Sequence, residues 1–147
     1  MLTLELLPAW PRLRDVLTGR REALADFTPL HREAGVTLLR WVRQNFDSGG
    51  RLLQQMPSGW PALSPATLAR RRQSGQGRQP LVNTGRLRNA FRLQATSGLA
   101  RLVNPLPYAM QHQQGLGVPR RPLFPETVQA RQIILPAIRA HMEKATR

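Results

Sequence analysis

Three histidines are the side chains of this chain best suited to metal binding or acid–base catalysis. His31, His112 and His141 lie far apart and fit neither an HxxxH nor an HxH spacing, so a metal site would need ligands from elsewhere in the fold. Paired carboxylates for acid–base chemistry cannot come from residues 48–124, because this segment contains no Asp or Glu. The chain has no cysteine, which excludes disulfides and thiolate metal sites.

The remaining catalytic patterns are also missing. A nucleophilic mechanism would have to combine a Ser or Thr with His112, and the chain has no GxSxG turn. Gly115-Leu116-Gly117 is too short to form a phosphate-binding loop. We therefore expect a protein that is not an enzyme and that uses no metal or cofactor.

Arginine dominates the charge. The net charge is +14, and residues 48–124 hold eleven Arg without one acidic residue. Such a segment cannot neutralise itself, so we expect an anionic partner, either nucleic acid or an acidic protein surface. A GC-rich genome would explain the preference for Arg over Lys, but it would not explain the missing acids. The candidate contacts with a partner or with DNA are Arg70, Arg71, Arg72, Arg78, Arg86 and Arg88.

Helical periodicity is clearest over residues 29–46, where apolar residues recur at steps of three and four. Thr28 is the expected N-cap of this helix, and a shorter helix is predicted over 11–26. A third helix is expected to begin at Ser64-Pro65, with Ser64 as N-cap, and to run into the arginine triplet. The polar, Gly-containing segment 74–79 then predicts a mobile loop.

The second half of the chain contains the strand signals. Alternating apolar and polar residues predict a β-hairpin over 91–104 with its turn at Ser97-Gly98. A short helix over 108–114 should be closed by Gly115, and residues 116–124 should be extended. The last helix is expected to start near Pro125-Glu126, with Pro136 kinking it or splitting it in two.

Together these elements predict an α+β fold, with helices at both ends packed on a small antiparallel sheet and long loops in the middle. The length suits a single domain over 1–147, divided into a helical part (1–47), a basic loop and hairpin part (48–124) and a C-terminal helix (125–147). No apolar run approaches the roughly 20 residues that span a bilayer. We expect a soluble protein that is cytosolic where it is made and has no contact with a membrane.

Several residues between 60 and 124 form motifs. Trp60 stands between Gly59 and Pro61, which favours a ring packed as an anchor, the alternative being a platform that stacks on a base or on a partner's side chain. The other candidates for a structural motif are Thr84, Gly85, Leu87, Tyr108, His112 and Gly115.

In their order along the chain, these motifs resemble the phage virion morphogenesis family, the tail-completion and neck proteins of Mu-like tailed phages. The resemblance covers about residues 30 to 145. Its four segments are Trp60-Pro61-x-Leu63-Ser64-x-x-Thr67, Leu81-x-x-Thr84-Gly85-x-Leu87, Tyr108-Ala109-x-x-His112-Gln113-x-Gly115 and Pro119-Arg120-Arg121-Pro122-Leu123.

The resemblance implies a structural protein of the virion neck. Such a protein would form a ring, with a hexamer favoured, and would help to join the DNA-filled head to the tail. Its partners would be copies of itself, the head-side connector or portal, and tail-side proteins, with loop 70–79 reaching one of them. In this reading Gly85 and Gly115 permit turns, Thr84 caps a short helix, and Tyr108 and His112 make packing or hydrogen-bonding contacts. The alternatives are a capsid assembly factor of the same virion and a DNA-binding protein that ignores sequence.

Overall fold

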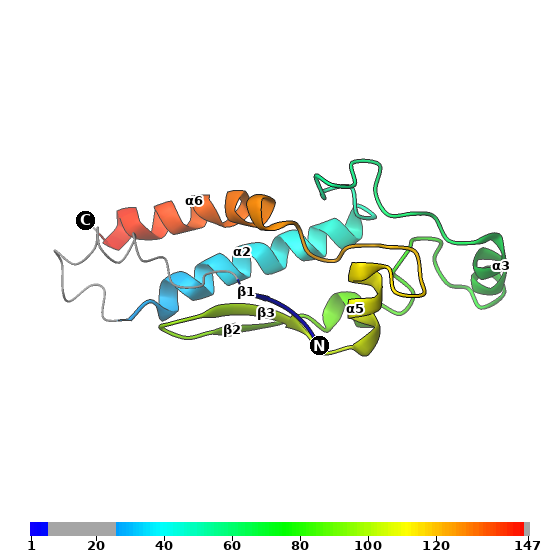
Figure 1. Cartoon of the computed structure of the whole chain (residues 1–147), viewed down its shortest axis with the longest axis horizontal. Helices are drawn as coiled ribbons and strands as arrows, with labels where there is room; N and C mark the ends of the chain where they lie inside the picture. The colour runs from blue at the N-terminus through cyan, green and yellow to red at the C-terminus, as the bar shows by residue number, and fades with distance from the viewer. Residues whose placement is uncertain (6–25, 146–147) are drawn as a thin grey trace.

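The computed structural model describes residues 1–5 and 26–145. In chain order these residues form β1 (Leu2–Glu5), α2 (Thr28–Asp47), α3 (Pro65–Gln73), α4 (Arg86–Asn89), β2 (Arg92–Ala95), β3 (Ala100–Asn104), α5 (Pro107–Gln114) and α6 (Thr127–Ala145) (Figure 1). The fold is α+β, as the sequence predicts. The helix expected over 11–26 lies almost entirely outside the described residues.

A three-stranded antiparallel sheet has the order β1-β3-β2. The predicted hairpin is confirmed: β2 pairs with β3, and Thr96 N donates to Leu99 O (2.8 Å) across the turn. The part predicted to be helical, residues 1–47, contains α2 and also a strand that was not predicted, because β1 pairs with β3 and places Leu2 opposite Asn104. Leu2 is buried, so the start of the chain contributes to the core.

Helix α2 forms the central layer, with the sheet on one side and α6 on the other (Figure 1). Its buried face carries five members of the predicted apolar series, Leu30, Ala34, Leu38, Val42 and Phe46, and the sixth, Trp41, is only partly buried. Gly35 lets the sheet come close, since a Cβ added there would lie 2.2 Å from Leu93 Cδ1 in β2.

The start of α2 differs from the expectation by one residue. Phe27, not Thr28, occupies the N-cap position, and the Asp26 carboxylate accepts a hydrogen bond from Thr28 N (2.8 Å). A carboxylate at this position satisfies a free amide and suits the positive end of the helix dipole. The first free amide of α2 is therefore bound by Asp26, the residue that precedes the N-cap.

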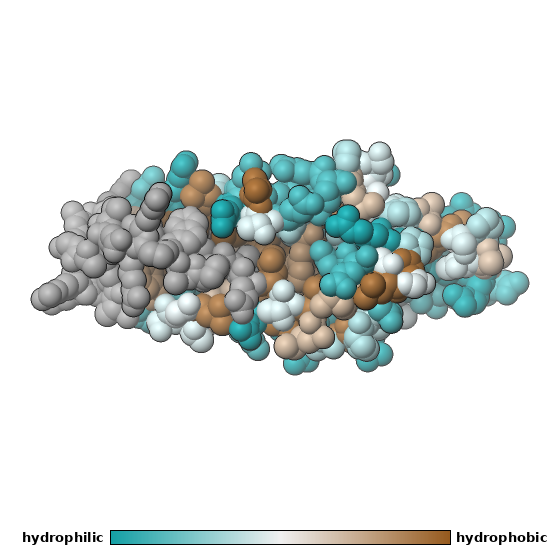
Figure 2. Space-filling model, viewed as in Figure 1, coloured by the Kyte–Doolittle hydropathy of each residue, from teal (hydrophilic) through white to brown (hydrophobic). Residues whose placement is uncertain are grey.

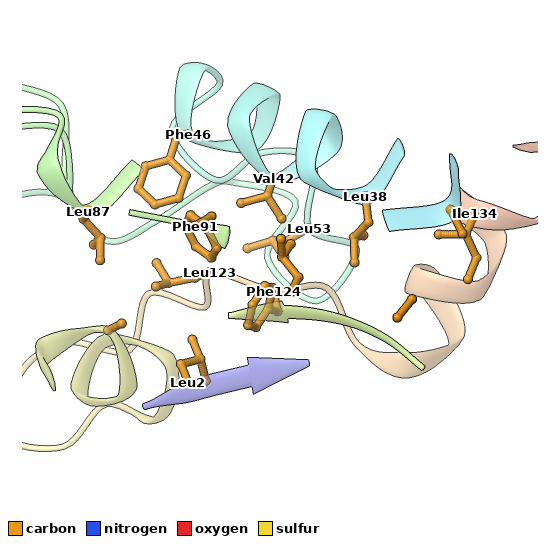
Figure 3. Packing of buried hydrophobic residues seen from close by; sticks show 14 of the residues in the cluster. Leu2, Leu38, Val42, Phe46, Leu53, Leu87, Phe91, Leu123, Phe124 and Ile134 are labelled. Atoms are coloured by element: carbon orange, nitrogen blue, oxygen red, sulfur yellow. The ribbon is translucent and has the colours of Figure 1, made fainter. Parts of the chain in front are cut away.

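Four aromatic rings form a row through the core. The ring centroids of Trp60 and Phe46 are 5.1 Å apart, those of Phe46 and Phe91 6.0 Å, and those of Phe91 and Phe124 5.5 Å, all close to edge-to-face. Figure 3 shows Phe46, Phe91 and Phe124 gathered beside α2. Because edge-to-face pairs add to the free energy of burial, this row ties α2 to the two loop segments that carry Trp60 and Phe124.

Helix α6 runs without interruption from Thr127 to Ala145, so Pro136 does not divide it. Proline removes one backbone hydrogen bond, and the exposed position of Pro136 lets water reach the carbonyl that has lost its partner. The buried apolar residues of α6 are Ala130, Ile134 and Ile138, and the helix packs against α2. No helix in the described part of the chain is long and apolar enough to cross a membrane.

Candidate functional site

A cleft of about 250 Å³ lies between α3, α4, α5 and the loops that join them. Each of the four sequence motifs contributes to its wall. The lining residues are Leu63, Arg71, Leu81, Asn83, Thr84, Gly85, Arg86, Leu87, Tyr108, His112 and Arg121. The structure therefore brings together segments that are separated by up to sixty residues in the sequence.

Helix α4 forms one wall and depends on a left-handed glycine. Gly85 occupies its N-cap position with φ +75°, a conformation that favours glycine. The expectation that Thr84 caps this helix is therefore corrected: Thr84 precedes the cap, and its hydroxyl lies 3.4 Å from Arg86 N. Leu87 is buried, and its carbonyl accepts a hydrogen bond from Asn104 Nδ2 (3.0 Å), which fixes α4 to the end of β3.

Helix α5 forms the opposite wall and is closed, as predicted, by Gly115 in the left-handed region (φ +77°). Tyr108 and His112 are one turn apart on α5, and their rings lie edge to face at 6.5 Å. Both side chains line the cleft. The carboxamide oxygen of Gln113 accepts hydrogen bonds from Leu123 N (2.7 Å) and Phe124 N (3.1 Å), so α5 also holds the segment that follows Arg121.

Arg121 joins three segments at the base of the cleft. Its buried guanidinium donates to Pro61 O (2.9 Å) and Ala62 O (3.0 Å), and its backbone N–H donates to His112 O (2.8 Å). Trp60 is fixed beside it, since the indole Nε1–H donates to Pro122 O (2.9 Å). Trp60 is only 6% exposed, which confirms the anchor and rules out the alternative of a stacking platform.

The six candidate contact arginines do not form one cluster. Arg71 donates to Gly77 O (3.0 Å) and Gln79 O (2.9 Å), so it closes the loop that follows α3. Arg88 forms an ion pair with Asp47 of α2 at 2.9 Å, so part of the charge of segment 48–124 is neutralised from outside that segment. The other four side chains, those of Arg70, Arg72, Arg78 and Arg86, are exposed. Of these four, only Arg86 lines the cleft.

Positive charges lie close together in the cleft. Burial, followed by the charge of Arg121, lowers the pKa of His112, and His112 Nδ1 is buried without a hydrogen-bond partner among the described residues. Burial, followed by the charge of Arg71, lowers the pKa of Arg121. No acidic residue of the described chain lines the cleft. Its electrostatic potential should therefore be positive, which favours an anionic group.

Arg121 was missed as a site residue, although it stands in one of the motifs. Arg120 and Arg121 are adjacent, and the sequence does not show which of them turns inward. The structure exposes Arg120 and buries Arg121. Leu63, Leu81 and Asn83 were also not singled out, because their role depends on how the loops before α3 and α4 fold together.

The other two histidines lie away from the cleft. His31 Nδ1 is 2.6 Å from Thr96 O at the hairpin turn, and His141 Nδ1 is 3.0 Å from a carboxylate oxygen of Glu33, joining α6 to α2. Within residues 1–5 and 26–145, no group of three or more His, Cys, Asp or Glu side chains could hold a metal ion.

The described chain is thus an α+β protein whose four motifs meet at one basic cleft. The family model of the Phage virion morphogenesis family matches residues 9–143, and the chain belongs to this family. The comparisons with curated proteins and with solved structures found no significant match. Membership of this family makes the protein a structural or assembly component of a phage virion.

Proposed function

We propose that this protein works at the virion neck as a tail-completion protein, in which identical copies form a ring that helps to join the DNA-filled head to the tail. A hexamer would match the symmetry of a tail tube. The protein acts through its surfaces and not as an enzyme. Its partners are the head-side connector or portal and the tail-side proteins. Family membership supports the virion role, and one feature of the fold supports the ring.

That feature is the arm, which we define as residues 61–78. It contains α3, and none of its residues is buried, although it lies between the buried Trp60 and the partly buried Gln79. In Figure 1 it extends from one end of the molecule, and Figure 2 shows a mainly hydrophilic surface there. A segment that adds nothing to the core is free to contact another molecule.

The arm is nevertheless held at both ends. Arg121 bonds the carbonyl groups of Pro61 and Ala62 at its start. At the other end, the Gln79 side chain donates to Phe46 O at the C-terminus of α2. In a closed ring, each subunit uses two different surfaces, and one surface of a subunit binds the other surface of its neighbour. An arm with a fixed base, pointing away from the core, suits the presenting surface.

Deletion of the gene tests the joining function. We expect lysates that contain full heads and finished tails that are not attached to each other, and a plasmid copy of the gene should restore complete virions. Normal virions in the deletion would contradict the proposal. Lysates without full heads would instead favour the capsid assembly role.

The ring itself is tested with purified protein, by electron microscopy and by sedimentation over a range of concentrations. The informative variant replaces arm residues 66–77 by a short Gly-Ser linker, which removes Arg71 from the cleft but leaves the cleft residues Leu63 and Arg121 in place. We expect rings from the natural chain and single subunits from the variant. Circular dichroism should show that the variant keeps its folded core.

Binding to DNA remains the alternative of a different class, and exposed Arg70, Arg72 and Arg78 on the arm favour it. If these side chains neutralise phosphates, the affinity for duplex DNA will fall steeply as salt is added. Titration of duplexes of unrelated sequence at several salt concentrations measures this. An affinity that does not depend on salt would exclude phosphate neutralisation by the arm.

A further inference from the structure

We infer that the cleft between α4 and α5 is a socket for a carboxylate side chain on a segment of another virion protein. The positive groups at its wall are Arg71, Arg86 and Arg121, the His112 ring lies beside them, and the apolar groups are Leu63, Leu81 and Leu87. This inference rests on the proposed function only for its setting, a virion in which the chain meets other proteins. It adds the chemistry of the partner and the place where the partner binds.

The positive charge of the cleft suits a carboxylate. The chain holds Arg71 and Arg121 close enough for their charges to oppose one another, the charge of Arg121 disfavours protonation of the His112 ring, and no described acid lies among these three side chains. Groups of like charge destabilise a fold, so such an arrangement is typical of a binding site. Bound carboxylate oxygens would accept charge-assisted hydrogen bonds from guanidinium groups.

The size and the walls of the cleft suit a protein side chain. A volume of about 250 Å³ is slightly below the usual range for small-molecule sites, about 300–1,000 Å³, and accommodates one or two side chains. Three leucines line it beside the positive groups, and they would contact the methylene groups and neighbours of an acidic residue. The phosphates of a DNA duplex lie on a broad, polar surface, which does not match a small cleft with apolar walls.

The identity of the partner follows from the carboxylates of the chain itself. Asp26, Glu33 and Asp47 already have partners within their own chain: Thr28 N, His141 and Arg88, respectively. Glu143 is also engaged. Among the acids whose side chains the structure describes, Glu126 is exposed and has no such partner, so a second copy could offer one free carboxylate from this set, whereas a different protein can supply a whole acidic segment.

Two arginines allow a matched test. The Arg86 side chain is exposed, lines the cleft and makes no hydrogen bond or ion pair with the other described residues, so Arg86→Gln should fold normally. Arg72→Gln removes the same charge from α3, outside the cleft. The probe is an array of short peptides with one Glu or Asp among varied neighbours. A second array carries Gln or Asn at the same positions.

We expect the natural chain to bind a subset of the acidic peptides and to lose that binding with the amide versions. Arg86→Gln should weaken the binding about tenfold or more, because a charge-assisted hydrogen bond is lost, and Arg72→Gln should leave it almost unchanged. Fluorescence anisotropy measures each affinity, and circular dichroism confirms that both variants are folded.

Three results of the peptide-binding experiment would overturn the inference. The first is the absence of binding to any acidic peptide, and the second is equal binding of acidic and amide peptides. The third is an equal loss of peptide affinity in Arg86→Gln and Arg72→Gln, which would indicate diffuse surface charge. Loss of self-association in Arg86→Gln, measured by sedimentation, would show that a second copy fills the cleft and would exclude a different protein as its occupant. None of these results decides whether the protein joins heads to tails, which the gene deletion tests separately.

Discussion

Trp60 and Pro122 are joined by a hydrogen bond of 2.9 Å from the indole Nε1–H to the proline carbonyl. The bond links the loop before the arm to the segment that leads into α6, and the Trp60 ring packs edge to face on Phe46. Two loops that are distant in the sequence thus become one support for the cleft.

We expect Trp60→Phe to lower the free energy of unfolding by about 1–3 kcal/mol, because the carbonyl of Pro122 loses its partner in a buried setting and a cavity is left. Chemical denaturation measures the change. Trp41→Phe is the matched control: Trp41 is partly exposed, so the same substitution should cost less. Equal losses would show that the hydrogen bond contributes nothing beyond the volume of the ring.

Glycine is required at two positions around the cleft. Gly115→Ala should destabilise the protein more than Gly85→Ala, since both residues have positive φ but a Cβ at 115 would lie 2.9 Å from Arg120 Cβ. The left-handed backbone alone accounts for about 1–2 kcal/mol. Gly98→Ala is the control, because φ is not positive there and a Cβ would meet nothing within 4 Å. Thermal unfolding of the three variants gives the order, which a large loss at Gly98 would contradict.

The ion pair between Arg88 and Asp47 should contribute little to stability. The two side chains are 29% and 61% exposed, and pairs of this kind are typically worth about 0.2–1 kcal/mol. We expect a double-mutant cycle with Arg88→Gln and Asp47→Asn to give a coupling energy in that range, smaller at high salt. A coupling of several kcal/mol that is unaffected by salt would show that the pair is shielded from solvent.

His112 should make stability depend on pH. Its pKa in the folded protein lies below the ordinary value of 6.5, because burial and the charge of Arg121 both disfavour the protonated ring. The unfolded chain therefore binds more protons in the window between the two pKa values. Stability is greatest above pH 6.5 and falls as the pH drops through that window, after which the contribution of His112 is constant.

The measurement is the free energy of unfolding between pH 7.5 and pH 5, for the natural chain and for His112→Gln. We expect the difference between the two proteins to shift in favour of the variant as the pH falls. Subtracting the two curves removes every contribution that the two proteins share. Parallel curves over the whole range would mean that the environment of His112 does not disfavour its charged form.

Local patterns predicted the elements that depend on near neighbours. The periodicity of 29–46 predicted α2, the alternation after Phe91 predicted the hairpin, and Ser64-Pro65 predicted the start of α3, where the Ser64 hydroxyl accepts from Thr67 N (3.2 Å). In each case the residues that decide the structure lie within one or two turns of each other. Strand β1 was missed because it is four residues long and its partner is near residue 104.

The cleft could be predicted only in part. The motifs identified Thr84, Gly85, Tyr108 and His112, but nothing in the sequence places α4 opposite α5 or turns Arg121 inward. The partners of Arg71 and Arg88 could not be predicted either. Arg71 binds backbone carbonyls of its own loop, and Arg88 binds Asp47, forty-one residues earlier. Such side chains are directed by the tertiary structure, which the arginine-rich composition does not reveal.

The pairing of Leu2 with Asn104 also constrains when the sheet can form. During synthesis, β1 leaves the ribosome long before β3 is translated. The first strand therefore stays unpaired while more than half of the chain is made. The hairpin of β2 and β3 can form as soon as it emerges from the ribosome. The unpaired edge of β3 is then available for pairing with β1. Until β1 docks, that edge is open to other chains as well. Cells that accumulate this protein at high concentration should therefore be most prone to aggregate it while it is still being synthesised.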